Sequence, residues 1–299
     1  MQVANEETVR EEMAANVGRQ LDLGRRCLQL WLQLDKDTAL NRSRLPSEVI
    51  RVAFAMNVKI CRQLRTVIDL CRRGEAADAE IIARSMYEAV LATGFVLVPR
   101  LILREFRNDG TVKRTIREPG KPLSRQLRAR LYLAHAQLFA ERFKTRHAGK
   151  PGKKRMATAV AKNADPRTIN RYRTLIGSGW TKRLCTHPYT YSGLSIANLA
   201  RSFGARIGRA FANWHDAVYP FQSEHVHAVD VVEFIETDED GNFRAKWNSE
   251  CAHVRRALEA GIAMFLADIG LLNDHIPFDV VMNTAIRSLC SEYQVLIKQ

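Results

Sequence analysis

The sequence lacks any apolar run approaching the roughly 18 to 20 residues that a membrane-spanning helix needs. Its longest apolar stretch, residues 89–98, is interrupted by Thr93 and Gly94. The first seven residues are acidic and lack the basic-then-apolar order of a secretory signal. We therefore expect a cytoplasmic protein that neither spans nor binds a membrane.

Cysteine offers little chemistry in this chain. The six cysteines include no C-x-x-C pair, the spacing typical of zinc and redox sites; they are Cys27, Cys61, Cys71, Cys185, Cys251 and Cys290. In a reducing compartment such residues are buried or half-buried free thiols. The sequence therefore indicates neither a metal site nor a bound cofactor.

Acidic residues are scarce in one part of the chain. Residues 100–183 hold 23 Lys or Arg and 5 Asp or Glu, whereas the remainder carries 23 basic and 27 acidic residues. The whole excess behind the net charge of +14 therefore lies in one segment. Lys and Arg that neutralise phosphates produce a salt-dependent affinity for nucleic acid. The segment thus favours an anionic partner, with RNA first and an acidic protein as the alternative.

Ten cations of this segment are the candidate nucleic-acid contacts. They are Arg128, Arg130, Arg142, Arg146, Lys153, Lys154, Arg155, Arg171, Arg173 and Lys182. The competing interpretation is a basic loop or helix face that is merely solvated. A membrane surface fits less well, since no wide apolar face with interfacial aromatics opposes these residues.

Helical periodicity dominates the chain and predicts an all-α, multi-helix bundle. The predicted helices span residues 6–35, 47–73, 75–97, 123–146, 196–219, 249–272 and 277–297, with a further short one at 167–175. Gly74 is expected to end the second helix and Pro99 the third. Residues 108–125 are expected to form a turn-rich connector.

Residues 231–247 carry the one convincing strand signal. They alternate around Asp238-Glu239-Asp240-Gly241-Asn242, which predicts one small β-hairpin. For the domain organisation, we expect an N-terminal helix within residues 1–44 and a single helical domain over residues 45–299. That domain would contain a basic insertion at about residues 100–183.

Two pairs of residues have spacings that suit chemistry. Arg84 and Glu88 lie four apart in a predicted helix, within reach of an ion pair, and a helix-locking role competes with a catalytic one. Ser223 and His227 lie one helical turn apart. Histidine titrates near neutral pH and can act as general acid or base, while Ser can hold a phosphate oxygen.

Three motifs carry a resemblance to a known family. They are Arg84-Ser85-Met86-Tyr87-Glu88 after a Gly-containing turn, Gly193-Leu194-Ser195-Ile196-Ala197-Asn198-Leu199-Ala200, and Tyr219 with Ser223 and His227. In order and spacing, residues 45–295 resemble the bacterial family named domain of unknown function 5677. The R-x-x-x-E helix and the later S-x-x-x-H are similar to the HEPN superfamily (higher eukaryotes and prokaryotes nucleotide-binding). Two R-x-x-x-x-H strings, Arg130 to His135 and Arg142 to His147, also resemble the HEPN ribonuclease motif.

The HEPN resemblance implies a helical core, a homodimer with the terminal histidine facing a cleft, and a role as a toxin or antiphage defence effector. By this resemblance His227 is the general acid or base, Arg84 stabilises the phosphorane charge, and Glu88 orients Arg84. Ser223 would hydrogen-bond a phosphate oxygen. One departure matters, because HEPN nucleases carry an Arg four to six residues before the His, whereas residues 220–223 are Pro-Phe-Gln-Ser.

Two classes of function therefore stay open on the sequence alone. The first is a metal-independent endoribonuclease. The second is a non-catalytic helical module that binds nucleic acid or an acidic protein partner through the cations of residues 100–183.

Overall fold

The computed structural model describes residues 6–36, 45–117, 121–146, 191–207, 210–217, 251–276 and 278–298, the short strands at 235–237 and 243–245, and the single positions 167 and 174. The chain divides into two compact units. Unit 1 comprises Met1–Leu45, Phe54–Thr93 and Asp216–Gln299, and unit 2 comprises Pro46–Ala53 and Gly94–His215. Each is treated by itself below.

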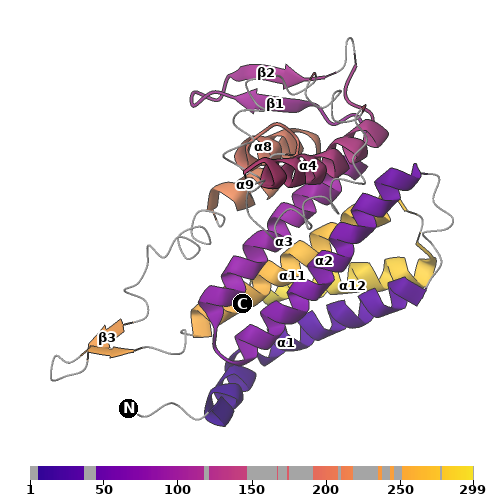
Figure 1. The fold of residues 1–299 in the computed structure, drawn as a ribbon. Helices are drawn as coiled ribbons and strands as arrows, with labels where there is room; N and C mark the ends of the chain where they lie inside the picture. Colours follow the sequence, from indigo (N-terminus) through magenta and orange to yellow (C-terminus); the bar gives the residue numbers. More distant parts are fainter. Residues whose placement is uncertain are drawn as a thin grey trace. The chain divides into compact units, whose positions relative to one another are not determined.

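Unit 1 is a bundle of long helices (Figure 1). It contains α1 (Glu6–Lys36), most of α2 (Ser47–Arg72) and of α3 (Ala76–Leu97), α11 (Cys251–Asn273) and α12 (Val280–Leu296). Helix α1 packs on both α11 and α12, which also pack on each other. Two glycines allow close packing: a Cβ on Gly24 would lie 2.9 Å from Ile68 Cδ1, and one on Gly261 would lie 3.1 Å from Val67 Cγ1.

Local signals set several helix boundaries in unit 1. Gly74 has a φ of +75°, the left-handed region that favours glycine, and its N–H donates to the Cys71 carbonyl oxygen at 3.1 Å. The Glu75 N–H donates to Leu70 O at 3.1 Å, which completes a Schellman motif at the end of α2. At the start of α12, Asp279 Oδ1 accepts from the Met282 N–H at 2.7 Å as an N-cap. The prediction that Gly74 ends the second helix is confirmed.

Unit 2 combines helices with a β-hairpin. Its elements are the start of α2, the end of α3, β1 (Leu103–Phe106), β2 (Val112–Ile116), α4 (Arg125–Arg146) and α8 (Ile196–Ile207), and α9 (Ala210–Ala217) begins there. The buried residues Phe95, Leu103, Leu131 and Phe203 form part of its core. Gly94 is required where α3 meets Phe203, since a Cβ there would lie 2.4 Å from the ring.

The β1–β2 hairpin was not expected from the sequence. The strands are antiparallel, with Leu103 opposite Ile116 and Glu105 opposite Arg114. Gly110 has a φ of +81° in the connecting turn, where the Arg107 N–H donates to Thr111 O at 2.8 Å. The prediction of a turn-rich connector over residues 108–125 is therefore wrong for residues 112–116, which form β2.

The predictions of an all-α helical bundle and of a small β-hairpin within residues 231–247 are confirmed, although the β1–β2 hairpin is a second one. The described residues form helices over most of their length, and β3 (Ile235–Thr237) pairs antiparallel with β4 (Phe243–Ala245) inside the predicted hairpin segment. No helix among the described residues is long and apolar enough to cross a membrane.

Candidate nucleic-acid interface

The Arg84–Glu88 pair lies on α3 in unit 1. Arg84 Nε is 3.7 Å from Glu88 Oε1, and the two side chains are 18% and 22% exposed. Nearby on α2, burial lowers the pKa of Lys59, and the charge of Glu88 acts in the opposite direction. The pair is thus a mostly buried ion pair that still reaches solvent at its edge.

The other two residues of the predicted catalytic set, Ser223 and His227, lie outside the described residues. The structure therefore gives no distance from either residue to Arg84 or Glu88. On α3 itself, Ser85 joins the helix to α2, because Gln63 Nε2 donates to Ser85 Oγ at 2.8 Å. Through this hydrogen bond, the segment that contains the R-x-x-x-E motif also helps to hold α2 and α3 together in unit 1.

Of the ten predicted nucleic-acid contacts, the structure describes the side chains of two, Arg128 and Arg130 on α4. Arg142 and Arg146 belong to the same helix, but their side chains are outside the described part. The other predicted contacts, Lys153, Lys154, Arg155, Arg171, Arg173 and Lys182, also lie outside the described residues.

Arg128 is buried in unit 2, with 0% of its side chain exposed. Its Nη2 donates to the Val98 carbonyl oxygen just beyond the end of α3, and its Cζ lies 5.9 Å from the centre of the Phe95 ring. Burial, and secondarily the charge of Arg125, lowers the pKa of Arg128 to about 9. In this conformation Arg128 holds α4 against α3 and offers no surface to a nucleic acid.

Arg130, two residues further along α4, is exposed. Its Nη2 lies 2.9 Å from Glu48 Oε1, and its Nε donates to the same oxygen at 3.2 Å. The pKa of Glu48 is lowered, first by a hydrogen bond from its own backbone and then by Arg130. Arg130 is therefore at the surface but already engaged by a carboxylate.

The R-x-x-x-x-H string from Arg130 to His135 does not form a paired site on α4. Arg130 turns to Glu48, whereas the His135 ring lies 6.4 Å from the Tyr191 ring centre. Residues five apart on a helix point in different directions, so the two side chains diverge. His147 of the second string lies outside the described residues.

The β1–β2 hairpin and the residues after it carry cations that were not among the ten predicted contacts. We call them the hairpin cations: Arg104, Arg107, Lys113, Arg114, Arg117 and Lys121. Arg107, Lys113, Arg117 and Lys121 are exposed. The available signal was the density of Lys and Arg around the Asn108-Asp109-Gly110 turn, which sequence reasoning assigned to a connector.

The nearby carboxylates are occupied within the hairpin. Glu105 is 2.9 Å from Lys113 Nζ through Oε1 and 3.3 Å from Arg114 Nε through Oε2. Asp109 Oδ1 accepts from the Thr111 N–H at 2.8 Å and from its hydroxyl at 2.7 Å, which lowers the pKa of Asp109. Among the described residues, Arg107 and Arg117 have no carboxylate within ion-pair distance.

Helix α8 holds the outer edge of the hairpin in place. Asn198 Oδ1 accepts from the Phe106 N–H at 3.2 Å, and Ser202 Oγ accepts from the Arg104 N–H at 3.0 Å. Asn198 and Ser202 lie four apart and share a face of α8, and Ser195 Oγ caps the helix by accepting from the Asn198 N–H. The Gly193-to-Ala200 motif thus positions the strand that carries Arg104.

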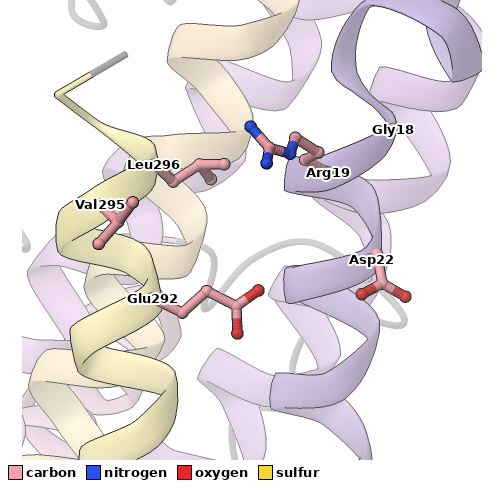
Figure 2. Close-up of a pocket in the computed structure, with 6 residues that line it drawn as sticks. All are labelled: Gly18, Arg19, Asp22, Glu292, Val295 and Leu296. Carbon is pink, nitrogen blue, oxygen red and sulfur yellow. The ribbon is translucent and has the colours of Figure 1, made fainter.

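A contrasting hollow of about 390 Å³ lies between α1 and α12 in unit 1 (Figure 2). Its lining includes Arg19, Asp22 and Glu292, and Figure 2 shows the Glu292 side chain extending from α12 toward α1. Arg26 pairs with both carboxylates. These two arginines and two carboxylates balance, so the described part of this hollow offers a phosphate no excess of positive charge.

Metal chemistry finds no support in the described part of the chain, where no three His, Cys, Asp or Glu are grouped so as to hold a metal ion. The described cysteines are free thiols, and burial raises the pKa of Cys27 to about 12.

Comparison with known proteins decides the family. A family model described as Family of unknown function (DUF5677) matches residues 51–243, well over half of the chain. The chain belongs to this family. The DUF5677 match includes the Arg84–Glu88 pair, the β1–β2 hairpin and α8, whereas α1, α11 and α12 lie outside it. Searches of curated proteins and of solved structures gave no match.

Proposed function

We propose that this protein binds RNA through unit 2. The observation that supports this best is the imbalance of charge at the hairpin: exposed cations such as Arg107 and Arg117 have no described carboxylate within ion-pair distance, while Glu105 is paired with two other cations of the hairpin. Cations free of acidic partners are those that gain most from a phosphate, because no existing ion pair must be broken. The choice of RNA follows the HEPN-like motifs, and we expect the binding to occur in the cytoplasm.

The test is a salt titration with matched variants. Fluorescence anisotropy of a labelled RNA should show affinity that falls steeply between about 50 and 200 mM salt. A triple variant of unit 2, Arg100→Ala with Arg107→Ala and Arg201→Ala, should weaken binding and reduce the salt slope by about 2. A second triple variant replaces exposed arginines in unit 1: Arg25→Ala with Arg62→Ala and Arg65→Ala. It removes the same charge and should leave the RNA affinity and the salt slope unchanged.

Two results would contradict the proposal: binding that does not respond to salt, or equal losses in the two triple variants. An acidic protein is the alternative partner. It would be favoured if the purified protein carried a bound protein and no nucleic acid, seen as a low ratio of absorbance at 260 nm to that at 280 nm.

A second candidate is RNA cleavage, favoured by the Arg84–Glu88 pair, which is partly buried yet still reaches solvent. In this proposal His227 takes the proton from the ribose 2′-hydroxyl, whose oxygen bonds to the adjacent phosphorus. The bond from phosphorus to the 5′ oxygen breaks, and that oxygen receives a proton, leaving a 2′,3′-cyclic phosphate and a 5′-hydroxyl. Arg84 would stabilise the charge on phosphorus, Glu88 would orient Arg84, and Ser223 would hold a phosphate oxygen.

Cleavage is tested with purified protein in EDTA. His227→Ala should lose at least about 100-fold in rate, as expected for a general acid or base, while His225→Ala should not. Equal rates in the two variants would rule out His227 as the general acid or base. If the wild-type protein does not cleave RNA, only the proposal of RNA binding remains.

A further inference from the structure

A second hollow, of about 220 Å³, lies beside the β1–β2 hairpin in unit 2. It is formed by the two strands and by the residues that flank them: Ile102, Arg104, Thr115, Ile116, Arg117, Lys121 and Pro122. All of these belong to the same unit, and none is among the ten contacts predicted from the sequence.

Three cations line the hollow, and its described lining contains no acidic residue. The geometry of the strand explains this. Successive side chains of a strand point to opposite faces, so Arg104 opposes Thr115 on one face while Glu105 opposes Arg114 on the other. The carboxylate of Glu105 is therefore paired with Lys113 and Arg114 and does not neutralise Arg104.

The backbone of Arg104 is held in place without a ligand. Its N–H donates to Ser202 Oγ, and the same hydroxyl lies 3.4 Å from the Arg104 carbonyl oxygen. The backbone under the cation is thus held both by the strand pairing and by α8. A cation on a held backbone loses less freedom when it binds a phosphate.

Apart from the cations and Thr115, the described lining is apolar. Ile116 is 4% exposed, Ile102 remains 40% exposed, and Pro122 completes the lining. Cations beside an exposed apolar patch suit a ligand with a charged end and a flat apolar part. The volume is below the roughly 300 to 1,000 Å³ of pockets that take whole drug-sized ligands, which suits one unit of a polymer.

We propose that this hollow holds one nucleotide of single-stranded RNA, with the phosphate against Arg104, Arg117 and Lys121 and the base against Ile102 and Pro122. The inference rests on the proposed RNA binding and names the class of RNA. In a duplex the base faces are stacked inside, so the apolar patch would lie unused. In a single strand the base is free to leave the stack and cover the patch.

The experiment compares one labelled RNA of about 12 nucleotides as a single strand and as a duplex. The wild-type protein should prefer the single strand by about tenfold. Ile102→Ala should reduce that preference several-fold without changing the salt slope, because it removes apolar contact and no charge. Arg117→Ala with Lys121→Ala should weaken single-strand binding more than the matched pair Arg100→Ala with Arg107→Ala, whose residues lie outside the hollow.

The outcomes separate this proposal from the broader one. Salt-sensitive binding with no preference for the single strand, or unchanged by Ile102→Ala, would overturn the nucleotide site and leave RNA binding standing. No binding to either RNA would overturn both. If Ile102→Ala loses its circular dichroism signal, Ile102→Val replaces it, since a smaller apolar change should still lower the preference.

Discussion

The two units use charge in different ways. In unit 1, buried polar groups find partners on other helices: Asp268 on α11 accepts from Asn57 Nδ2 on α2 at 2.8 Å, and Glu80 on α3 lies 2.7 Å from Arg256 on α11. In unit 2, cations outnumber the described carboxylates, and Glu48 and Glu105 are already paired with cations. The difference separates charges that hold helices together from charges available to a ligand.

The largest effect is expected at Asp268, which is fully buried in unit 1. Burial raises the pKa of Asp268 from 3.8 to about 6, against the opposing hydrogen bonds of Asn57 and Thr93. Because the folded protein binds this proton more tightly than the unfolded chain does, stability is highest below about pH 4 and falls as the pH rises to about 6. Asp268→Asn should therefore raise the free energy of unfolding at pH 7 by up to about 3 kcal/mol.

The measurement is urea unfolding at several pH values from 4 to 7. The gain from Asp268→Asn should shrink as the pH falls from 6 toward 4, because the folded carboxyl takes up its proton over this range and the unfolded one begins to do so near pH 4. Asp274→Asn, at an exposed position just beyond α11, is the control and should change little. A constant gain at every pH would show that ionisation of Asp268 is not the cause.

The second prediction concerns Arg128 in unit 2. Like the buried charges of unit 1, Arg128 is buried and holds two helices together. Arg128→Ala removes the hydrogen bond to Val98 O and leaves a cavity beside Phe95. We expect the free energy of unfolding to fall by about 2 kcal/mol, because lost packing and an unmatched carbonyl outweigh the cost of burying the cation. Thermal unfolding measures this, and the salt slope of RNA binding should not change. A lower slope with unchanged stability would return Arg128 to the RNA-binding set.

The sequence predicted the helices well because their signals are local. Apolar periodicity, Pro46 at the opening of α2 and Gly74 at its end all act within a few residues. The β1–β2 hairpin was missed because its strands, Leu-Arg-Glu-Phe and Val-Lys-Arg-Thr-Ile, are short and rich in charge. What fixes them is the contact of Asn198 and Ser202 on α8, about a hundred residues away, with the edge of β1.

The candidate contacts depended even more on tertiary packing. Arg128 and Arg130 are the same residue type two positions apart on one helix, and composition treats them alike. A helix rotates by about 200° over two residues, so one side chain enters the core and the other reaches solvent. The density of Lys and Arg along the sequence located the basic unit. Only the packing of α4 and the pleat of β1 show which of these cations face outward.

The smallest effect is expected from Glu48, whose carboxylate holds the exposed Arg130. An exposed ion pair contributes little to stability, so Glu48→Gln should change the free energy of unfolding by less than about 1 kcal/mol. Releasing Arg130 gives a phosphate one more cation to contact, and RNA affinity should rise a few-fold at low salt with a salt slope steeper by about 0.7.

The same substitution in an Arg130→Ala background separates this cause from a general loss of negative charge. With Arg130 absent, Glu48→Gln has no cation to release, and its effect on affinity should nearly vanish. Titration of the four proteins with one RNA measures the coupling between the two residues. An equal rise in both backgrounds would show that Glu48 acts through the overall field of unit 2 and that Arg130 does not contact the RNA.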